Sequence, residues 1–138
     1  MKKTLLISLI LISTISITHK RCKVKSKPKQ VQKTIKVKYT VYNAVVGQCD
    51  DSPLITADMS KIDTCKLNRG KLKWIAISRD LDKVLPMATK VLISKAGKFN
   101  GVWIVHDRMN KRFTNKIDFL VPSNIKLGKG FAHLQIIK

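Results

Sequence analysis

Residues 102–120 read VWIVHDRMNKRFTNKIDFL. Two apolar segments, Val102–His106 and Lys116–Leu120, flank a polar and basic connection, and this pattern predicts two β-strands. Asp107 ends the first predicted strand, and Asp118 lies inside the second. Because the two aspartates are eleven residues apart, a chain reversal between the strands would bring both carboxylates to one groove.

Four further segments have the β-branched composition or the alternation of apolar and polar residues that strands favour. They are Ile35–Tyr42, Trp74–Ile77, Lys90–Ser94 and Ala132–Ile137. Among the 138 residues, Ile and Val total 27 against six Ala, which favours strands over helices. Short strands joined by irregular loops are typical of a small closed barrel, since closure leaves no exposed strand edge. The sequence therefore predicts a mostly β domain with six strands.

The segments between these strands carry other signals. Residues 43–73 contain Gly, Pro, Asn and Asp at short intervals, which predicts long loops. Ser78 is expected to cap a short helix that extends through Leu85 and ends at Pro86. One short helix is therefore expected beside the barrel.

The N-terminal segment differs in composition from the rest of the chain. Two lysines precede an apolar run from Leu5 to Ile17, which is short for a membrane span and typical of a secretory signal peptide. We expect a signal peptide over 1–19, a basic linker over 20–34 and the barrel domain over 35–138. A retained N-terminal anchor is the alternative. In either case the domain is exported, to the periplasm, the cell envelope or the medium.

The basic charge of the chain is unevenly distributed. Lys and Arg total 28 against eight acidic residues, all of them Asp, for a net charge of +20. Residues 1–38 hold eleven basic and no acidic side chains, and this excess weakens any argument from total charge to nucleic-acid binding. The linker also lacks the interleaved aromatic side chains of single-strand binders, so no specific nucleic acid is expected. A solvated tether is the simple interpretation, with weak association with anionic wall polymers or a membrane surface as the alternative.

Three cysteines bear on the compartment and on metal binding. Cys49 and Cys65 lie sixteen positions apart, and export permits a disulfide between them. Such a bridge would stabilise the fold by about 3 kcal/mol, while two buried thiols are the alternative. Cys22 lies in the linker. Neither a CxxC pair nor a Cys/His cluster suggests a metal site, and no cofactor is expected.

Three motifs occur in a defined order. They are PLITA at 53–57, then WIAISRDL at 74–81 followed by LPMAT at 85–89, and finally Asp107 with Asp118-Phe119. From Tyr39 to Leu120 the chain thereby resembles the double-psi β-barrel group that includes the Asp-Asp-Asp (3D) domains. Rare lipoprotein A-like proteins, expansins and the barrel of membrane-bound lytic transglycosylase A share that fold. The resemblance implies a six-stranded double-psi β-barrel, in which Met59 and Ala88 stand where the family has glycine.

The resemblance also implies an activity, which is lytic transglycosylase cleavage of β-1,4 glycosidic bonds in peptidoglycan. One carboxylic acid protonates the leaving oxygen and then, as a carboxylate, accepts the proton of the sugar's own C6 hydroxyl, which attacks internally. By position, Asp118 is this acid/base and Asp107 is its catalytic neighbour. Two carboxylates in one groove cannot both ionise easily, so one pKa is expected to rise.

Alternatives remain for both aspartates and for the function. Asp107 could bind backbone amides, and Asp118 could pair with Arg108 or Arg112. The second candidate function is a barrel that binds peptidoglycan or another polysaccharide without cutting it. Six residues are expected to contact the glycan in either case: Tyr42, Asn43, Gln48, Asp51, Thr56 and Asn110. The protein is expected to be a monomer whose partner is the glycan strand.

Overall fold

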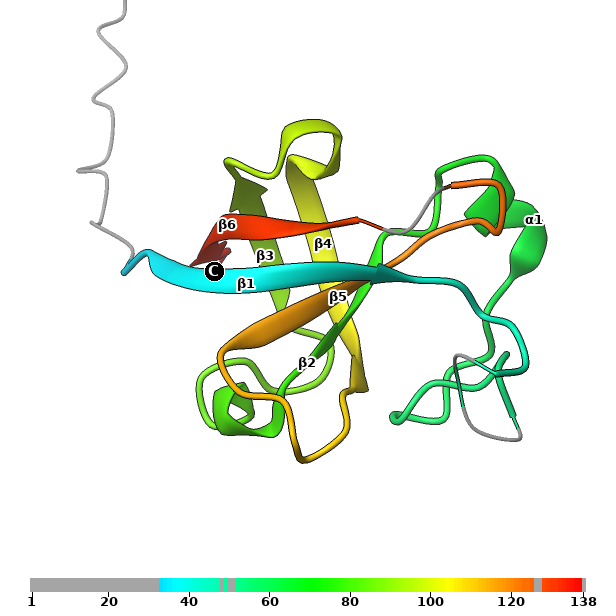
Figure 1. Cartoon of the computed structure of the whole chain (residues 1–138), viewed down its shortest axis with the longest axis horizontal. Helices are drawn as coiled ribbons and strands as arrows, with labels where there is room; N and C mark the ends of the chain where they lie inside the picture. Colours follow the sequence, from blue (N-terminus) through cyan, green and yellow to red (C-terminus); the bar gives the residue numbers. More distant parts are fainter. Residues whose placement is uncertain (1–32, 48, 50–51, 126–127, 138) are drawn as a thin grey trace, which may run out of the picture. The chain divides into compact units, whose positions relative to one another are not determined.

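The structure is a computed structural model that describes residues 33–47, 49, 52–125 and 128–137. Six strands, one α-helix and two 3-10 turns follow one another along this part of the chain (Figure 1). They are β1 (Ile35–Tyr42), α1 (Thr64–Asn68), β2 (Trp74–Ile77), η1 (Arg79–Leu81), β3 (Lys90–Ser94), η2 (Gly97–Phe99), β4 (Gly101–Arg108), β5 (Lys116–Leu120) and β6 (Lys129–Ile136). The predicted signal peptide, residues 20–32 of the predicted linker and Cys22 lie outside the described residues.

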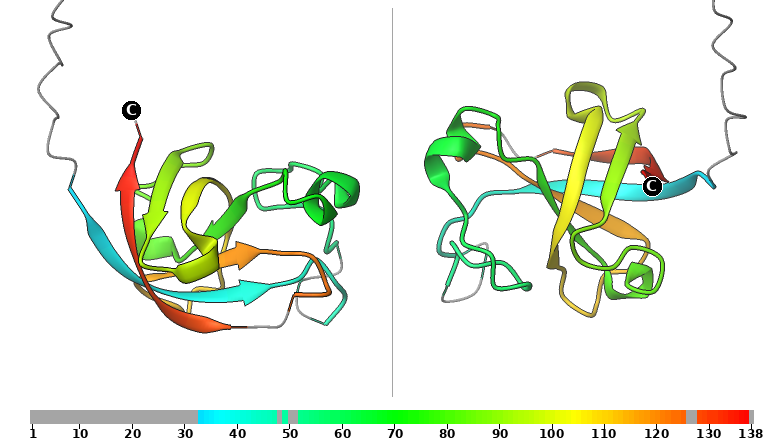
Figure 2. Two further views of the ribbon diagram at one scale, coloured as in Figure 1. Left: turned by 90° about the horizontal axis from the view of Figure 1, so that it is seen from above. Right: turned by 180° about the vertical axis from the view of Figure 1, so that it is seen from behind.

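The six strands close into a barrel in the order β1-β5-β2-β4-β3-β6, so the prediction of a mostly β, six-stranded barrel with one short helix is confirmed. Two neighbouring pairs are parallel, β1 with β5 and β2 with β4. The other pairs are antiparallel, including β1 with β6, which curve along one side of the barrel in Figure 2. The first and last strands thus lie side by side and complete the ring.

An aromatic cluster fills the barrel interior around Phe119. Its ring stacks on Phe99 at 4.8 Å between centroids and also contacts Trp103 at 4.6 Å and Tyr39 at 5.4 Å. Burial of a side chain of this size contributes about 1.5–3 kcal/mol. Because successive side chains of a strand point to opposite faces, the burial of Phe119 turns its neighbour Asp118 away from this core.

The helical elements differ from the prediction. The α-helix lies at Thr64–Asn68, inside the segment predicted as loops, where the Asp63 carboxylate accepts a hydrogen bond from the Lys66 amide and Leu67 is buried. Residues 79–81 form a 3-10 turn in place of the predicted helix through Leu85. Ser78 makes no capping bond there, because its hydroxyl accepts the amide of Lys116 at 3.0 Å and so anchors the start of β5. None of the described helices has the length and apolar character of a membrane span.

The disulfide predicted between Cys49 and Cys65 is not formed in the structure, where both side chains are thiols. The Cys49 thiol faces the backbone carbonyl of Asn43 at 3.5 Å, while Cys65 lies exposed on α1. The two residues therefore occupy separate environments, one in the loop that follows β1 and one on the helix surface.

Candidate active site

A groove of about 730 Å³ opens at one end of the barrel, a size within the usual range of ligand sites. Its lining comes from β1, β2, η1, β4 and β5, from the loops that follow β1, and from the connection between β4 and β5. Five residues predicted from the sequence line it: Tyr42, Thr56, Asp107, Asn110 and Asp118. The eleven-residue spacing of the two aspartates therefore does bring both carboxylates to one groove.

Strand register sets the positions of the two aspartates. Ala76 on β2 lies opposite Asp107 on one side and opposite Asp118 on the other. A β-bulge makes this alignment, since Ile75 pairs with Val105 while Ala76 pairs with Asp107, which leaves His106 as an extra residue of β4. The small Ala76 side chain thus lines the groove between two carboxylates.

Asp118 has a strongly perturbed carboxyl group. Burial raises the pKa of Asp118 to about 6, and the charge of Asp107 adds to this rise, while the Thr40 hydroxyl and the Lys116 ammonium oppose it. Its Oδ1 atom is buried without a hydrogen-bond partner in the described part of the chain. The predicted alternative of a pair with Arg108 or Arg112 is not observed there, since Arg108 pairs with Asp82 and Arg112 forms no ion pair within the described residues. A carboxyl group with this pKa can hold a proton in mildly acidic solution and release it near neutrality.

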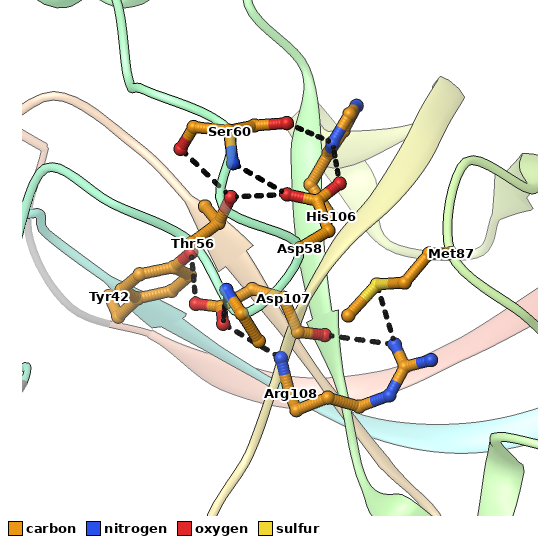
Figure 3. A network of polar contacts seen from close by, with 9 residues as sticks. Tyr42, Thr56, Asp58, Ser60, Met87, His106, Asp107 and Arg108 are labelled. Atoms are coloured by element: carbon orange, nitrogen blue, oxygen red, sulfur yellow. Dashed lines mark hydrogen bonds and ion pairs between the residues drawn. The ribbon is translucent and has the colours of Figure 1, made fainter.

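Asp107 is held in one orientation by three donors (Figure 3). Its Oδ1 accepts the amides of Ala57 at 3.0 Å and Arg108 at 2.8 Å, and its Oδ2 accepts the Tyr42 hydroxyl at 3.3 Å. Burial raises the pKa of Tyr42 well above its ordinary range, with Asp107 adding to the rise, so the phenol remains a donor. The amide bonds match the alternative that the sequence left open for Asp107.

A second polar network fixes the loop that supplies Ala57. The Asp58 carboxylate accepts hydrogen bonds from the Thr56 hydroxyl at 2.7 Å and the Ser60 amide at 3.0 Å, and it contacts His106 Nδ1 at 2.5 Å (Figure 3). Although burial opposes the effect, these hydrogen bonds lower the pKa of Asp58 to about 2. The His106 ring also lies 4.1 Å from the Trp74 ring. His106, the bulged residue of β4, therefore holds Asp58 in place. The neighbouring Ala57 amide is the one that donates to Asp107.

The remaining predicted residues have different positions. Asn43 is buried outside the groove, where its amide donates to the carbonyls of Val121 at 3.1 Å and Pro122 at 2.8 Å. It therefore supports the loop after β5 and is not brought to the two aspartates. Gln48 and Asp51 lie outside the described residues. Asn110 is exposed, and its carboxamide oxygen accepts the amide of Arg112 at 3.1 Å.

Sequence reasoning missed several contributors to the site. Arg79, Arg108 and Arg112 also line the groove, and the Asp58–His106 pair supports it. The sequence of the basic connection between β4 and β5 does not indicate which of its arginines lines the groove. Within the described residues, no cluster of three or more His, Cys, Asp or Glu side chains could hold a metal ion.

In comparisons with known proteins, no family model matches the chain, and no curated protein matches it.

Proposed function

We propose that the chain is an exported cell-wall protein whose barrel cleaves β-1,4 glycosidic bonds of peptidoglycan as a lytic transglycosylase. The observation that carries this proposal is the Asp118 carboxyl group, which lines a ligand-sized groove beside Asp107 with its pKa raised to about 6. A general acid needs a pKa near the working pH, and a carboxyl group rarely attains one in open solvent.

In the proposed reaction, protonated Asp118 gives its proton to the glycosidic oxygen as the bond to the anomeric carbon breaks. The resulting Asp118 carboxylate then takes the proton of the sugar's C6 hydroxyl, whose oxygen forms the new bond to the anomeric carbon. The product is a 1,6-anhydro sugar, and Asp118 is again protonated. Asp107 is fixed by three donors, so its charge can stabilise the positive character of the sugar in the transition state.

The assignment to the double-psi, rare lipoprotein A-like group rests on motif order and is supported by backbone geometry. Met59 and Ala88 replace the family's glycines, and both have left-handed backbone angles, with φ of 66° and 64°. L-residues rarely adopt this conformation, whereas glycine does so readily. The parallel pairs β1/β5 and β2/β4 are also in keeping with two interlocked crossovers.

The surroundings of the protein follow from the N-terminal composition. We propose a signal peptide over 1–19, a basic linker over 20–34 and export of the barrel to the periplasm, the cell envelope or the medium. The barrel is proposed to be a monomer. The seven basic residues of the linker would allow weak association with anionic wall polymers or a membrane surface. Specific nucleic-acid binding and a cofactor form no part of the proposal.

A non-catalytic peptidoglycan-binding barrel is the second candidate. It is favoured by Asp107, whose Oδ1 accepts two backbone amides and so has a structural role that needs no chemistry. Fold alone does not separate the two functions, since one architecture hosts many activities.

Digestion of purified sacculi tests both candidates. The full chain should release 1,6-anhydro-muropeptides, and Asp118→Asn should lower this release at least a hundredfold, in keeping with loss of acid–base catalysis. Asp63→Asn is the matched control, because it removes one carboxylate at the exposed N-terminus of α1 and asparagine still caps a helix. Retention of the wild-type chain on sacculi without any release would leave the binding function alone.

A further inference from the structure

The groove has an uneven distribution of charge along its lining. Three arginines contribute to it, one from η1, one from the end of β4 and one from the β4–β5 connection: Arg79, Arg108 and Arg112. Another part of the lining is apolar and comes from the loops after β1, with Ile55 45% and Met59 80% exposed. Exposed apolar side chains beside guanidinium groups are suited to a ligand that carries both kinds of surface.

One of the three arginines is already neutralised. Arg108 Nε forms an ion pair with Asp82, and Arg108 Nη1 contacts Met87 Sδ at 3.1 Å and the Asp107 carbonyl at 3.4 Å. Its side chain is only 14% exposed, so this arginine is a structural part of the β4 end. It is therefore unsuited to bind a ligand.

Arg79 and Arg112 differ from Arg108 in both respects. Both are exposed, and neither forms an ion pair within the described part of the chain. The Arg112 guanidinium lies 4.9 Å from the centre of the Phe113 ring, and the Lys116 ammonium lies 4.3 Å from the same ring. Contact with an aromatic ring limits the freedom of the guanidinium and leaves its N–H groups available to an anion.

The acidic groups of the groove do not neutralise these two arginines. Asp107 is occupied by Tyr42 and two backbone amides, and Asp118 has no arginine partner among the described residues. The groove therefore presents two guanidinium groups that form no ion pair within the described residues and that a ligand's carboxylate can bind. An arginine fork recognises a carboxylate through two parallel hydrogen bonds, which gives orientation as well as affinity.

We propose that Arg79 and Arg112 bind carboxylate groups of an acidic glycan and thereby select peptidoglycan strands that carry free acids over neutral polysaccharides. This inference rests on the proposed function, since it names the chemical group of the glycan that the same groove recognises. Two sources can supply the acid, the peptide attached to the sugar or, where that peptide has been removed, the lactyl group of the sugar itself. Both are carboxylates, whose two oxygens can accept two parallel hydrogen bonds from one guanidinium group.

Retention on four substrates, each immobilised on a solid support, tests the inference. The substrates are native sacculi, sacculi whose carboxylates have been converted to amides with carbodiimide and ammonia, peptide-free glycan from amidase treatment, and the amidated form of that glycan. All proteins are the full chain with Asp118→Asn, so that binding is measured without cleavage. Arg79→Gln/Arg112→Gln is compared with Arg69→Gln/Lys90→Gln, which removes the same charge from exposed residues outside the groove.

We expect the parent protein to bind native sacculi about tenfold more tightly than amidated sacculi, as for two surface arginine–carboxylate contacts. The groove variant should bind both about equally, and the control variant should lose less than twofold. If peptide-free glycan shows arginine-dependent binding until it is amidated, the lactyl acid exposed by peptide removal is a ligand. If peptide removal alone abolishes that binding, the peptide acid is the ligand.

Three other results would overturn the inference. Equal binding to native and amidated sacculi would show that the groove does not read carboxylates, while the proposed function would stand. Equal losses in the groove and control variants would assign the effect to total charge. Failure of the parent protein to bind any of the four substrates would remove the proposed function together with the inference.

Discussion

Asp107 and Asp118 lie on two strands, β4 and β5, that are separated by a single strand. Two strand spacings place their Cα atoms about 10 Å apart. Ala76 of the intervening strand occupies the position between them, so the space available to a ligand at this point depends on one methyl group.

Replacement of Ala76 tests whether this space is used. Ala76→Leu should reduce release of anhydro-muropeptides more than tenfold, because the larger side chain fills the groove between the two carboxylates. Overpacking of this kind also costs about 1–3 kcal/mol, so the free energy of unfolding is measured beside the activity. Ala76→Ser is the small control and should retain most activity. Full activity in a folded Ala76→Leu protein would place the chemistry elsewhere.

The pKa of Asp118 predicts a pH profile. The proposed cleavage needs the protonated acid, so its kcat/KM should be highest below pH 6 and fall as the pH rises through about 6. The Thr40 hydroxyl opposes the raised pKa, so Thr40→Val should move the alkaline limb of the profile to higher pH. Initial rates of release between pH 4.5 and 8 would measure the limb, and an unchanged limb in Thr40→Val would contradict the assignment to Asp118.

The raised pKa of Asp118 also predicts how the stability of the folded protein depends on pH. Its folded-state pKa of about 6 lies above the ordinary value of 3.8, so the folded protein loses stability as the pH rises from about 4 to 6. Asp118→Asn removes this penalty and should be more stable than wild type at pH 8 by about 1–3 kcal/mol, with little difference at pH 4. Urea unfolding at the two pH values measures the effect. A variant less stable at pH 8 would show that the buried charge is compensated.

Asp58 has the opposite dependence. Its folded-state pKa of about 2 lies below the ordinary value of 3.8, so its contribution to stability is present above pH 4 and is lost as the pH falls toward 2. Asp58→Asn should cost about 1–2 kcal/mol at pH 7, because it weakens the bonds to Thr56, Ser60 and His106. Thermal unfolding curves of variant and wild type should converge near pH 2. Curves that stay apart at that pH would mean that Asp58 acts through packing.

The left-handed backbone at Ala88 predicts a stabilising substitution. Ala88→Gly removes the strain of φ 64° while it keeps the Ala88 amide, which donates to the Val105 carbonyl at 2.8 Å. The relief of about 1–2 kcal/mol exceeds the entropic cost of glycine in the unfolded chain, so a net gain of about 0.5–1 kcal/mol is expected. Ala44→Gly, at a residue outside the positive-φ set, should destabilise instead. Equal losses in both variants would contradict the strain argument.

The barrel was largely predictable because its strands carry their own signal. The alternation of Ile35–Tyr42 and the apolar segments of β2, β3 and β5 coincide with the observed strand bounds. The helix α1 was missed because a five-residue helix with one buried side chain, Leu67, leaves no period in the sequence. In the sequence, the capping residue Asp63 cannot be told from an aspartate in a loop. Its capping role is evident only from the hydrogen bond that it accepts from the Lys66 amide.

The site was predictable in part. The two aspartates and Tyr42 share a groove, as expected, because strand order brings the β1 end, β4 and β5 together. The roles of His106 and the arginines were not predictable, since they depend on a one-residue bulge in β4 and on the choice of partner that Arg108 makes. Neither feature changes the composition of the segment in which it occurs.

Barrel closure has a consequence for the order in which the chain can mature. Strand β6 pairs with both β1 and β3, so a nascent chain that lacks its final strand leaves two open sheet edges. The barrel cannot close until β6 has been translated. Closure of the barrel is therefore expected to come after translation of β6, which joins β1 from the start of the domain to β3 from its middle.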